Sequence, residues 1–168
     1  MKKTLIIALC CITVLIAACK KEKPYEKFIG EYEGTVYING TMTVTGLYTQ
    51  NLDNEPFELN FTLTQGTSDN QVILTYHPQG QSETYATTGT IADNYVDFEP
   101  ITFNQNVDQS HVDATIDLEG TLSGNDLAMI GTMNGSGTLQ TDQMLIPAQF
   151  TMNATLKGTV TKQVESPK

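Results

Sequence analysis

Residues 150–160 read FTMNATLKGTV, a stretch in which every second side chain is apolar or glycine. In an extended chain the apolar residues of such a stretch fall on one face and the polar residues on the other. Residues 112–119, VDATIDLE, and residues 57–63, FELNFTL, repeat the same alternation. A period of two residues is typical of β-strands with one buried face. The sequence therefore predicts an all-β fold.

Turn-forming residues separate these alternating runs. Asn39-Gly40 lies between two β-prone runs and is the strongest hairpin signal in the chain. Further turns are predicted at residues 51–56, 66–70, 78–81, 92–94, 104–110, 123–126 and 141–143. The turns divide residues 28–161 into about eight to ten strands, which we expect to form one domain.

A Gly-Thr-apolar triplet recurs along the chain. It begins at Gly34, Gly40, Gly89, Gly120, Gly131, Gly137 and Gly158. The irregular spacing excludes a propeller or solenoid repeat. Glycine inside a strand marks a bend or bulge, which a sheet needs in order to close on itself and so to remove its exposed edges. We therefore expect a single antiparallel up-and-down β-barrel, with a two-sheet β-sandwich as the alternative.

The first 18 residues differ from the rest of the chain. Lys2 and Lys3 precede a run of mostly apolar residues that ends at Ala18. This run is shorter than the ~20 apolar residues that a membrane-spanning helix needs. A short cationic start, an apolar segment and small residues before a cleavage site are typical of a secretory signal peptide. We therefore expect residues 1–18 to be removed on export.

Ile16-Ala17-Ala18-Cys19 resembles the lipobox of bacterial lipoproteins, in which the cysteine is acylated and becomes the first residue of the mature chain. The resemblance implies that Cys19 is the lipidation site, that the chain is a lipid-anchored protein of the cell envelope, and that a membrane is its partner. Because Lys rather than Asp follows the cysteine, it also implies the outer membrane. An ordinary cleaved signal with a stray cysteine is the alternative.

The cysteines agree with this interpretation. Cys10 and Cys11 would be lost with the signal and Cys19 would carry lipid, so the mature chain would have no disulfide, thiolate metal ligand or cysteine nucleophile. Residues 19–27 are predicted to be a short tether, which reaches at most ~28 Å when extended and would keep the domain near the lipid surface. Residues 162–168 are predicted to be a disordered tail.

Positive charge is missing from the body of the chain. The protein has nine lysines, no arginine and nineteen acidic residues, for a net charge of −10, and residues 28–156 contain no lysine. Nucleic-acid binding needs cations against phosphate, so we exclude it. Anionic small molecules would likewise lack a cationic clamp. Neutral, apolar or cationic ligands remain possible, and solubility alone also explains an acidic surface.

Residues 28–36, FIGEYEGTV, the following Asn39-Gly40 signal and the closing LKGTV at residues 156–160 resemble the calycin-like (lipocalin-like) β-barrel domains of small Bacteroides-type lipoproteins. Calycins at large carry small apolar ligands inside the barrel. The resemblance therefore implies a binding barrel. We expect no cofactor, since no cofactor-binding motif is present. The chain departs from the lipocalin signature, because Tyr32 stands where an early Trp is expected and the protein contains no Trp or Arg.

No motif predicts a catalytic residue. His77 and His111 stand in no metal-binding spacing. Gly135-Ser136-Gly137 lacks the spacing of a nucleophile elbow.

One polar grouping lies on a single predicted strand, on the side opposite the apolar residues of 112–118. It consists of His111, Asp113, Asp117 and Glu119. It is a weak candidate patch for a divalent or cationic ligand. Residues along a flat strand make a poor cage for an ion such as Ca²⁺, which takes roughly six to eight surrounding oxygens, so a solvated outer face is the favoured interpretation and no metal site is predicted.

Three functions follow as hypotheses. We expect most a non-catalytic barrel that binds a small neutral or apolar ligand. An accessory or structural envelope protein that makes protein–protein contacts without a pocket is the alternative, and a glycan-acting enzyme that uses a carboxylate pair is a remote one. Methionines that can fill an adaptable interior favour the first hypothesis, although gap-filling core is the commoner interpretation; they are Met42, Met129, Met133, Met144 and Met152.

Overall fold

The computed structural model of this chain describes residues 22–77, 84–107, 110–139 and 147–163. The predicted signal peptide, the lipobox residues Ile16, Ala17 and Ala18, and the lipidation site Cys19 lie outside the described residues. The predicted turns at 78–81 and 141–143 and most of the predicted tail lie outside them as well.

The described residues form one short 3₁₀ helix and nine β-strands. They are η1 (Pro24–Lys27), β1 (Gly30–Val44), β2 (Tyr48–Gln65), β3 (Gln71–Tyr76), β4 (Tyr85–Ala92), β5 (Tyr95–Phe98), β6 (Ile101–Val107), β7 (Ser110–Ser123), β8 (Asp126–Leu139) and β9 (Ala148–Lys162). Every strand pairing is antiparallel. The predicted all-β fold and the predicted strand number are confirmed.

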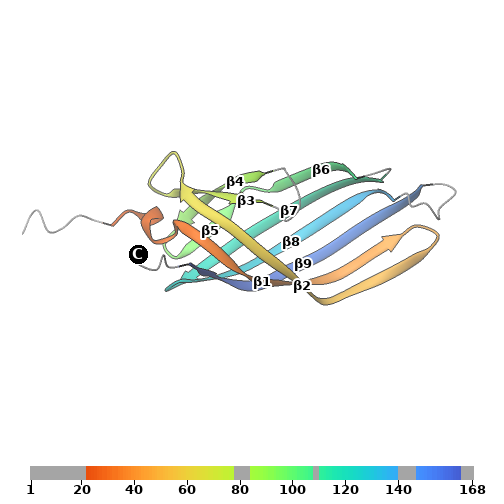
Figure 1. Cartoon of the computed structure of the whole chain (residues 1–168), viewed down its shortest axis with the longest axis horizontal. Coiled ribbons are helices and arrows are strands. Elements are labelled where there is room, and N and C mark those ends of the chain that lie inside the picture. Colours follow the sequence, from red (N-terminus) through yellow and green to blue (C-terminus); the bar gives the residue numbers. More distant parts are fainter. Residues whose placement is uncertain (1–21, 78–83, 108–109, 140–146, 164–168) are drawn as a thin grey trace, which may run out of the picture.

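The strands make one sheet that curls into a ring. Their order is β5-β4-β3-β2-β1-β9-β8-β7-β6, and β5 also pairs with β7. This last pairing closes a circuit of β1 to β5 and β7 to β9 (Figure 1). The single antiparallel barrel is therefore confirmed, and the alternative two-sheet sandwich is not observed.

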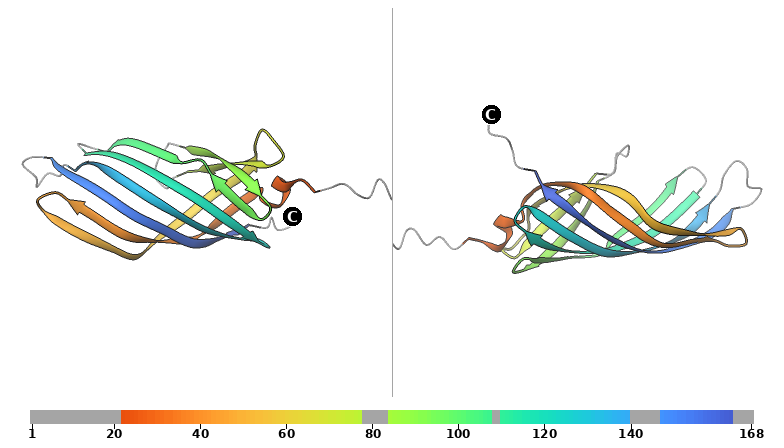
Figure 2. Two further views of the ribbon diagram at one scale, coloured as in Figure 1. Left: turned by 180° about the vertical axis from the view of Figure 1, so that it is seen from behind. Right: turned by 90° about the horizontal axis from the view of Figure 1, so that it is seen from below.

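Closure is complete at one end of the barrel only. β7 pairs with β5 over residues 119–121, whereas its residues 110–116 pair with β6. β2 pairs with β3 only over residues 61–65, and its residues 48–60 have no strand on that side within the described part of the chain. In that part no ladder joins β4 to β6 either; we call this line the β4–β6 seam. The β1–β2 hairpin and β6 thus diverge at the end opposite η1 (Figures 1 and 2).

The closed end is filled by a packed core. η1 places Phe28 inside the barrel with 0% of its surface exposed. The hydroxyl of buried Tyr32 donates a hydrogen bond to the Phe28 carbonyl over 2.8 Å, and the Tyr32 ring stacks on Phe61 at 5.4 Å. Around them pack Leu63, Val72, Leu74, Ile91, Val96, Phe98, Leu122, Leu127, Met129 and Val160. This core, which we call the floor, seals the barrel at the end where the chain enters.

The docked part of the N-terminal segment is longer than the sequence suggests. Pro24–Lys27, predicted as tether, form η1, and the Tyr25 N–H donates to the Asp69 carbonyl. Lys23 Nζ pairs with the Asp69 carboxylate at 3.0 Å. At the other end of the chain, Lys162 belongs to β9 rather than to a disordered tail. The Gln163 N–H continues the sheet by bonding to a β1 carbonyl.

The predicted hairpin at Asn39-Gly40 is wrong. β1 runs through both residues and turns only at residues 45–47, where Gly46 has a φ of +77°. The register between β1 and β2 shifts between Ile38 and Gly40, because β2 carries a bulge at this level with Asn54 at φ 53°. Continuous pairing of β1 with β9 on its other side keeps the chain extended through these residues and overrides the local turn preference.

Of the remaining predicted turns in the described chain, those at residues 66–70, 92–94 and 123–126 are confirmed. The turn predicted at 51–56 is wrong, since these residues lie inside β2 and contain its bulge. The break predicted at 104–110 is too long, because β6 continues to Val107 and β7 begins at Ser110. In both cases the polar residues within these strands imitate a loop signal.

The recurrent glycines lie on the inner face of the barrel. A Cβ atom added at Gly158 would lie 2.4 Å from the Thr35 carbonyl oxygen and 2.6 Å from the Val36 Cα. The missing side chain thus lets β9 approach β1 closely at this point. The threonine of each triplet faces outward and its apolar residue faces inward, as for Thr159 and the fully buried Val160.

Candidate functional site

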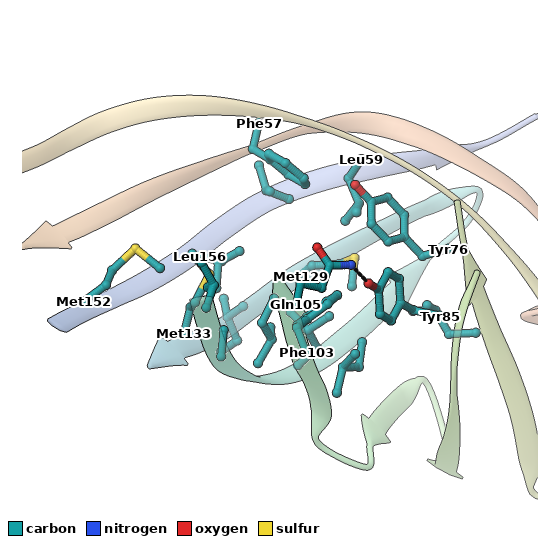
Figure 3. Close-up of a pocket in the computed structure, with 18 residues that line it drawn as sticks. Phe57, Leu59, Tyr76, Tyr85, Phe103, Gln105, Met129, Met133, Met152 and Leu156 are labelled. Carbon is teal, nitrogen blue, oxygen red and sulfur yellow. Dashed lines mark hydrogen bonds between the residues drawn. The ribbon is translucent and has the colours of Figure 1, made fainter. Parts of the chain in front are cut away.

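Beyond the floor the barrel is hollow. It holds a cavity of about 370 Å³, within the range of small-molecule pockets. Figure 3 shows its eighteen lining residues. They are Val36, Phe57, Leu59, Leu74, Tyr76, Tyr85, Ile101, Phe103, Gln105, Val112, Ala114, Ile116, Leu118, Met129, Ile130, Met133, Met152 and Leu156. None of the eighteen carries a charge.

β7 supplies the predicted apolar face. Val112, Ala114, Ile116 and Leu118 line the cavity, as the alternation in VDATIDLE predicts. Side chains at alternate positions of a strand share one face, so the polar residues between them point away from the cavity.

Three of the five methionines expected in the mature chain line the cavity, on β8 and β9 (Figure 3). Met129 sits at the floor with 1% of its surface exposed, and Met133 and Met152 are partly exposed further along. Met42 is the β1 partner of Met152, and Met144 lies outside the described residues. Methionine side chains are flexible and polarisable, so this wall can adapt to apolar ligands of different shape.

Polar groups gather on the opposite side, along the β4–β6 seam. Tyr76 ends β3 and Tyr85 begins β4, and the two are cross-strand partners. Gln105 Nε2 of β6 donates a hydrogen bond to the Tyr85 hydroxyl, and the Tyr85 and Phe103 rings meet at 4.4 Å (Figure 3). Side chains thus connect β4 to β6 where the backbones do not.

The Tyr76 hydroxyl has a different environment. Its ring contacts Phe57 of β2 at 6.5 Å between centroids, and within the described residues its hydroxyl makes no hydrogen bond. Burial raises the pKa of Tyr76 above its ordinary value. The side chain therefore remains a protonated, neutral hydrogen-bond donor at the edge of an apolar cavity.

Sequence reasoning did not find Tyr76, Tyr85 or Gln105. A signal was present for one of them. Every second residue of β6 points into the cavity, and these inward positions hold Ile101, Phe103 and Gln105. A polar residue thus stands at an inward position of that strand. The two tyrosines carry no comparable signal, because only the way the barrel closes brings the ends of β3 and β4 beside β6.

The predicted polar patch of His111, Asp113, Asp117 and Glu119 does not converge on one point. His111 Nε2 lies 3.0 Å from Asp113 Oδ2, and Asn104 of β6 donates to the other oxygen of Asp113 over 2.6 Å. Asp117 accepts a hydrogen bond from a β8 threonine. In the described chain no three potential metal ligands come together.

Glu119 of the same patch accepts a hydrogen bond from the Tyr95 hydroxyl of β5. This bond raises the pKa of Tyr95 to about 12. Each acid of the patch thus has its own cross-strand neighbour. The other histidine, His77, is exposed and lies 2.9 Å from the Thr84 hydroxyl through Nδ1.

Fold and cavity together define a class: an all-β barrel, closed at one end by its own N-terminal segment, with an uncharged cavity behind that closure. The sequence matches no protein-family model, and no curated protein is detectably similar to it. Among the described residues, no helix has the length and apolar character needed to cross a bilayer.

Proposed function

We propose that this protein is a lipid-anchored envelope protein whose barrel binds a small neutral or apolar molecule without transforming it. The observation that carries the proposal is the lining of the cavity, which is apolar except for two tyrosines and one glutamine. Burial of apolar surface contributes about 25 cal/mol of free energy per Å², so such a cavity favours apolar ligands.

The lining also supports a non-catalytic role. General acid–base and nucleophilic catalysis most often use a carboxylate, imidazole, thiol or amine, and none of these is among the eighteen residues around the cavity. Of the side chains that can serve in such catalysis, the lining offers the phenols of Tyr76 and Tyr85. Acids of the described strand β7, such as Asp117 and Glu119, lie on the outer face instead, where they favour solubility.

The location is proposed from the N-terminal sequence. Lys2, Lys3 and the apolar run to Ala18 fit a signal peptide, and Ala17-Ala18-Cys19 fits a lipobox. A lipid on Cys19 would hold the barrel at a membrane through its closed end, since Cys19 lies only five residues before Pro24 of η1. The outer membrane is the proposed site.

A photo-crosslinking experiment tests binding. The full-length protein in lipid nanodiscs is irradiated with a diazirine-bearing medium-chain alkane, and the modified residues are mapped by mass spectrometry. We expect modification on the inward residues of β7, β8 and β9. Ala114→Phe, which fills the cavity, should abolish it, whereas Ala128→Phe on the exposed outer face of β8 should not. Equal labelling of the two variants would overturn the proposal.

A further inference from the structure

The cavity has two chemically different sides, and from this difference, resting on the proposed function, we infer the class of ligand. We propose that the barrel binds a neutral amphiphile of medium length. Its apolar body would lie along β8 and β9, and its one uncharged hydrogen-bond acceptor, such as an ester or ketone oxygen, would face the Tyr76 hydroxyl (Figure 3).

The apolar body is assigned to the side of the methionines. Met129, Met133, Met152 and Leu156 present no hydrogen-bonding group to the cavity, except for the weak thioether acceptors. A polar atom placed against this wall would lose its hydrogen bonds to water without replacement, at a cost of about 1–3 kcal/mol by mutational measures. This wall therefore favours the hydrocarbon part of a ligand.

The polar end is assigned to the seam. Tyr76 is a neutral hydroxyl at the rim of the cavity that makes no hydrogen bond within the described residues, and its ring is held against Phe57 of β2. The Tyr85–Gln105 hydrogen bond lies on the same side, so polar atoms are concentrated there. This partly buried hydroxyl is reached by solvent, and a ligand oxygen in the cavity would replace water as its acceptor.

The lack of charged residues around the cavity indicates that the ligand is neutral. The chain has no arginine, and residues 28–156 contain no lysine, so no permanent cation from this segment can pair with a carboxylate or phosphate head. The lining contains no acid either, so a cationic head would be unpaired. An unpaired charge in such an environment is neutralised or excluded.

The length of the ligand follows from the volume. A cavity of about 370 Å³ holds roughly a dozen non-hydrogen atoms, at the ~30 Å³ that each water molecule occupies in the liquid. This is the size of a medium-chain ester or ketone. A long-chain lipid would extend out of the cavity along the open end.

Two matched probes test the class of ligand: diazirine-bearing decanoic acid and its methyl ester. Both are applied to the full-length protein in nanodiscs at neutral pH, and unlabelled competitor gives the apparent Kd. We expect the ester to bind at least tenfold more tightly than the ionised acid. The acid should approach the ester as the pH is lowered and its carboxylate is protonated. Equal binding of ester and ionised acid at neutral pH would overturn the inferred neutrality.

Tyr76→Phe tests the acceptor, because it removes the hydroxyl and keeps the ring against Phe57. We expect it to weaken ester binding about three- to tenfold more than it changes binding of the alkane probe, as for one lost hydrogen bond. Tyr37→Phe, on an outward side chain that is 45% exposed, is the matched control and should bind like the wild type.

The outcomes separate the two proposals. If the alkane binds inside the barrel but Tyr76→Phe has no effect on the ester, the cavity is a binding site and the assigned acceptor is wrong. If neither the alkane nor the ester labels the inward residues, the proposed function itself fails.

Discussion

Asn39 of β1 holds the bulge of β2 through Asn54. The Asn54 N–H donates to Asn39 Oδ1 over 3.0 Å, and Asn39 Nδ2 donates to Asn54 Oδ1 over 3.3 Å. Asn54 has a left-handed backbone with φ 53°, which asparagine tolerates better than most residues. The amide of Asn39 thus satisfies a backbone group that the bulge removes from the ladder.

We therefore expect Asn39→Ala to lower the free energy of unfolding by about 1 kcal/mol, since one net hydrogen bond to the backbone is lost. Urea denaturation measures the change. Asn153→Ala, on the exposed face of β9, is the matched control and should stay within about 0.5 kcal/mol of the wild type. If Asn39→Ala loses no more free energy of unfolding than Asn153→Ala, the Asn39 side chain does not stabilise the bulge.

The same pair explains what the sequence could and could not predict. Asn-Gly between β-prone runs is a hairpin signal only when the chain is judged locally. Here Asn39 is also the partner of Thr155 on β9, more than a hundred residues away in the chain. That long-range pairing decides the conformation, and no local pattern reports it. The alternation of residues 112–119, by contrast, predicts the cavity wall because burial of one strand face is a local property.

The residues of the candidate site also fall into two groups: those that local sequence predicts and those that depend on long-range pairing. Ala114 and Met133 could be placed on inward faces from period and residue type alone. Tyr76 could not, because its role depends on where β3 ends, on the seam beside β6 and on the Phe57 ring that contacts it. These are consequences of how the barrel closes.

Phe28 and Phe57 are expected to contribute very differently to stability. Phe28 is fully buried in the floor, whereas Phe57 lines the cavity and is 37% exposed. Phe28→Ala should lower the free energy of unfolding by about 3–5 kcal/mol, because it leaves a hole in packed core. Phe57→Ala should lower it by less than half as much, since its site is already partly open. Chemical denaturation compares them, and similar losses would contradict a packed floor beneath a hollow end.

We expect any side chain at position 158 to destabilise the barrel. An added Cβ would lie 2.4 Å from the Thr35 carbonyl oxygen, which is backbone and cannot move aside without distorting β1. Gly158→Ala should therefore lower the melting temperature by several degrees, as for a loss of more than about 1 kcal/mol. Thr159→Ala, one residue on and exposed, should change it little. Thermal unfolding followed by far-UV circular dichroism makes the comparison.

Tyr32 is expected to make stability depend on pH in the alkaline range. Burial raises the pKa of Tyr32 from 10.0 to about 12 in the folded chain. A raised pKa means that the folded state disfavours the ionised phenol. The stabilising contribution of Tyr32 is therefore complete below pH 10 and is lost as the pH rises from 10 to about 12. Between pH 9 and 11 this group alone should remove about 1 kcal/mol of the free energy of unfolding.

Tyr32→Phe tests this dependence. The variant loses the hydrogen bond to the Phe28 carbonyl, so at pH 8 it should be less stable than the wild type by about 1 kcal/mol. Because phenylalanine does not titrate, its stability should then fall less than that of the wild type between pH 9 and 11. Urea midpoints at the three pH values measure both effects, and Tyr37→Phe on the outer face provides the control. A variant that loses as much stability as the wild type between pH 9 and 11 would show that the alkaline transition begins elsewhere than in the floor.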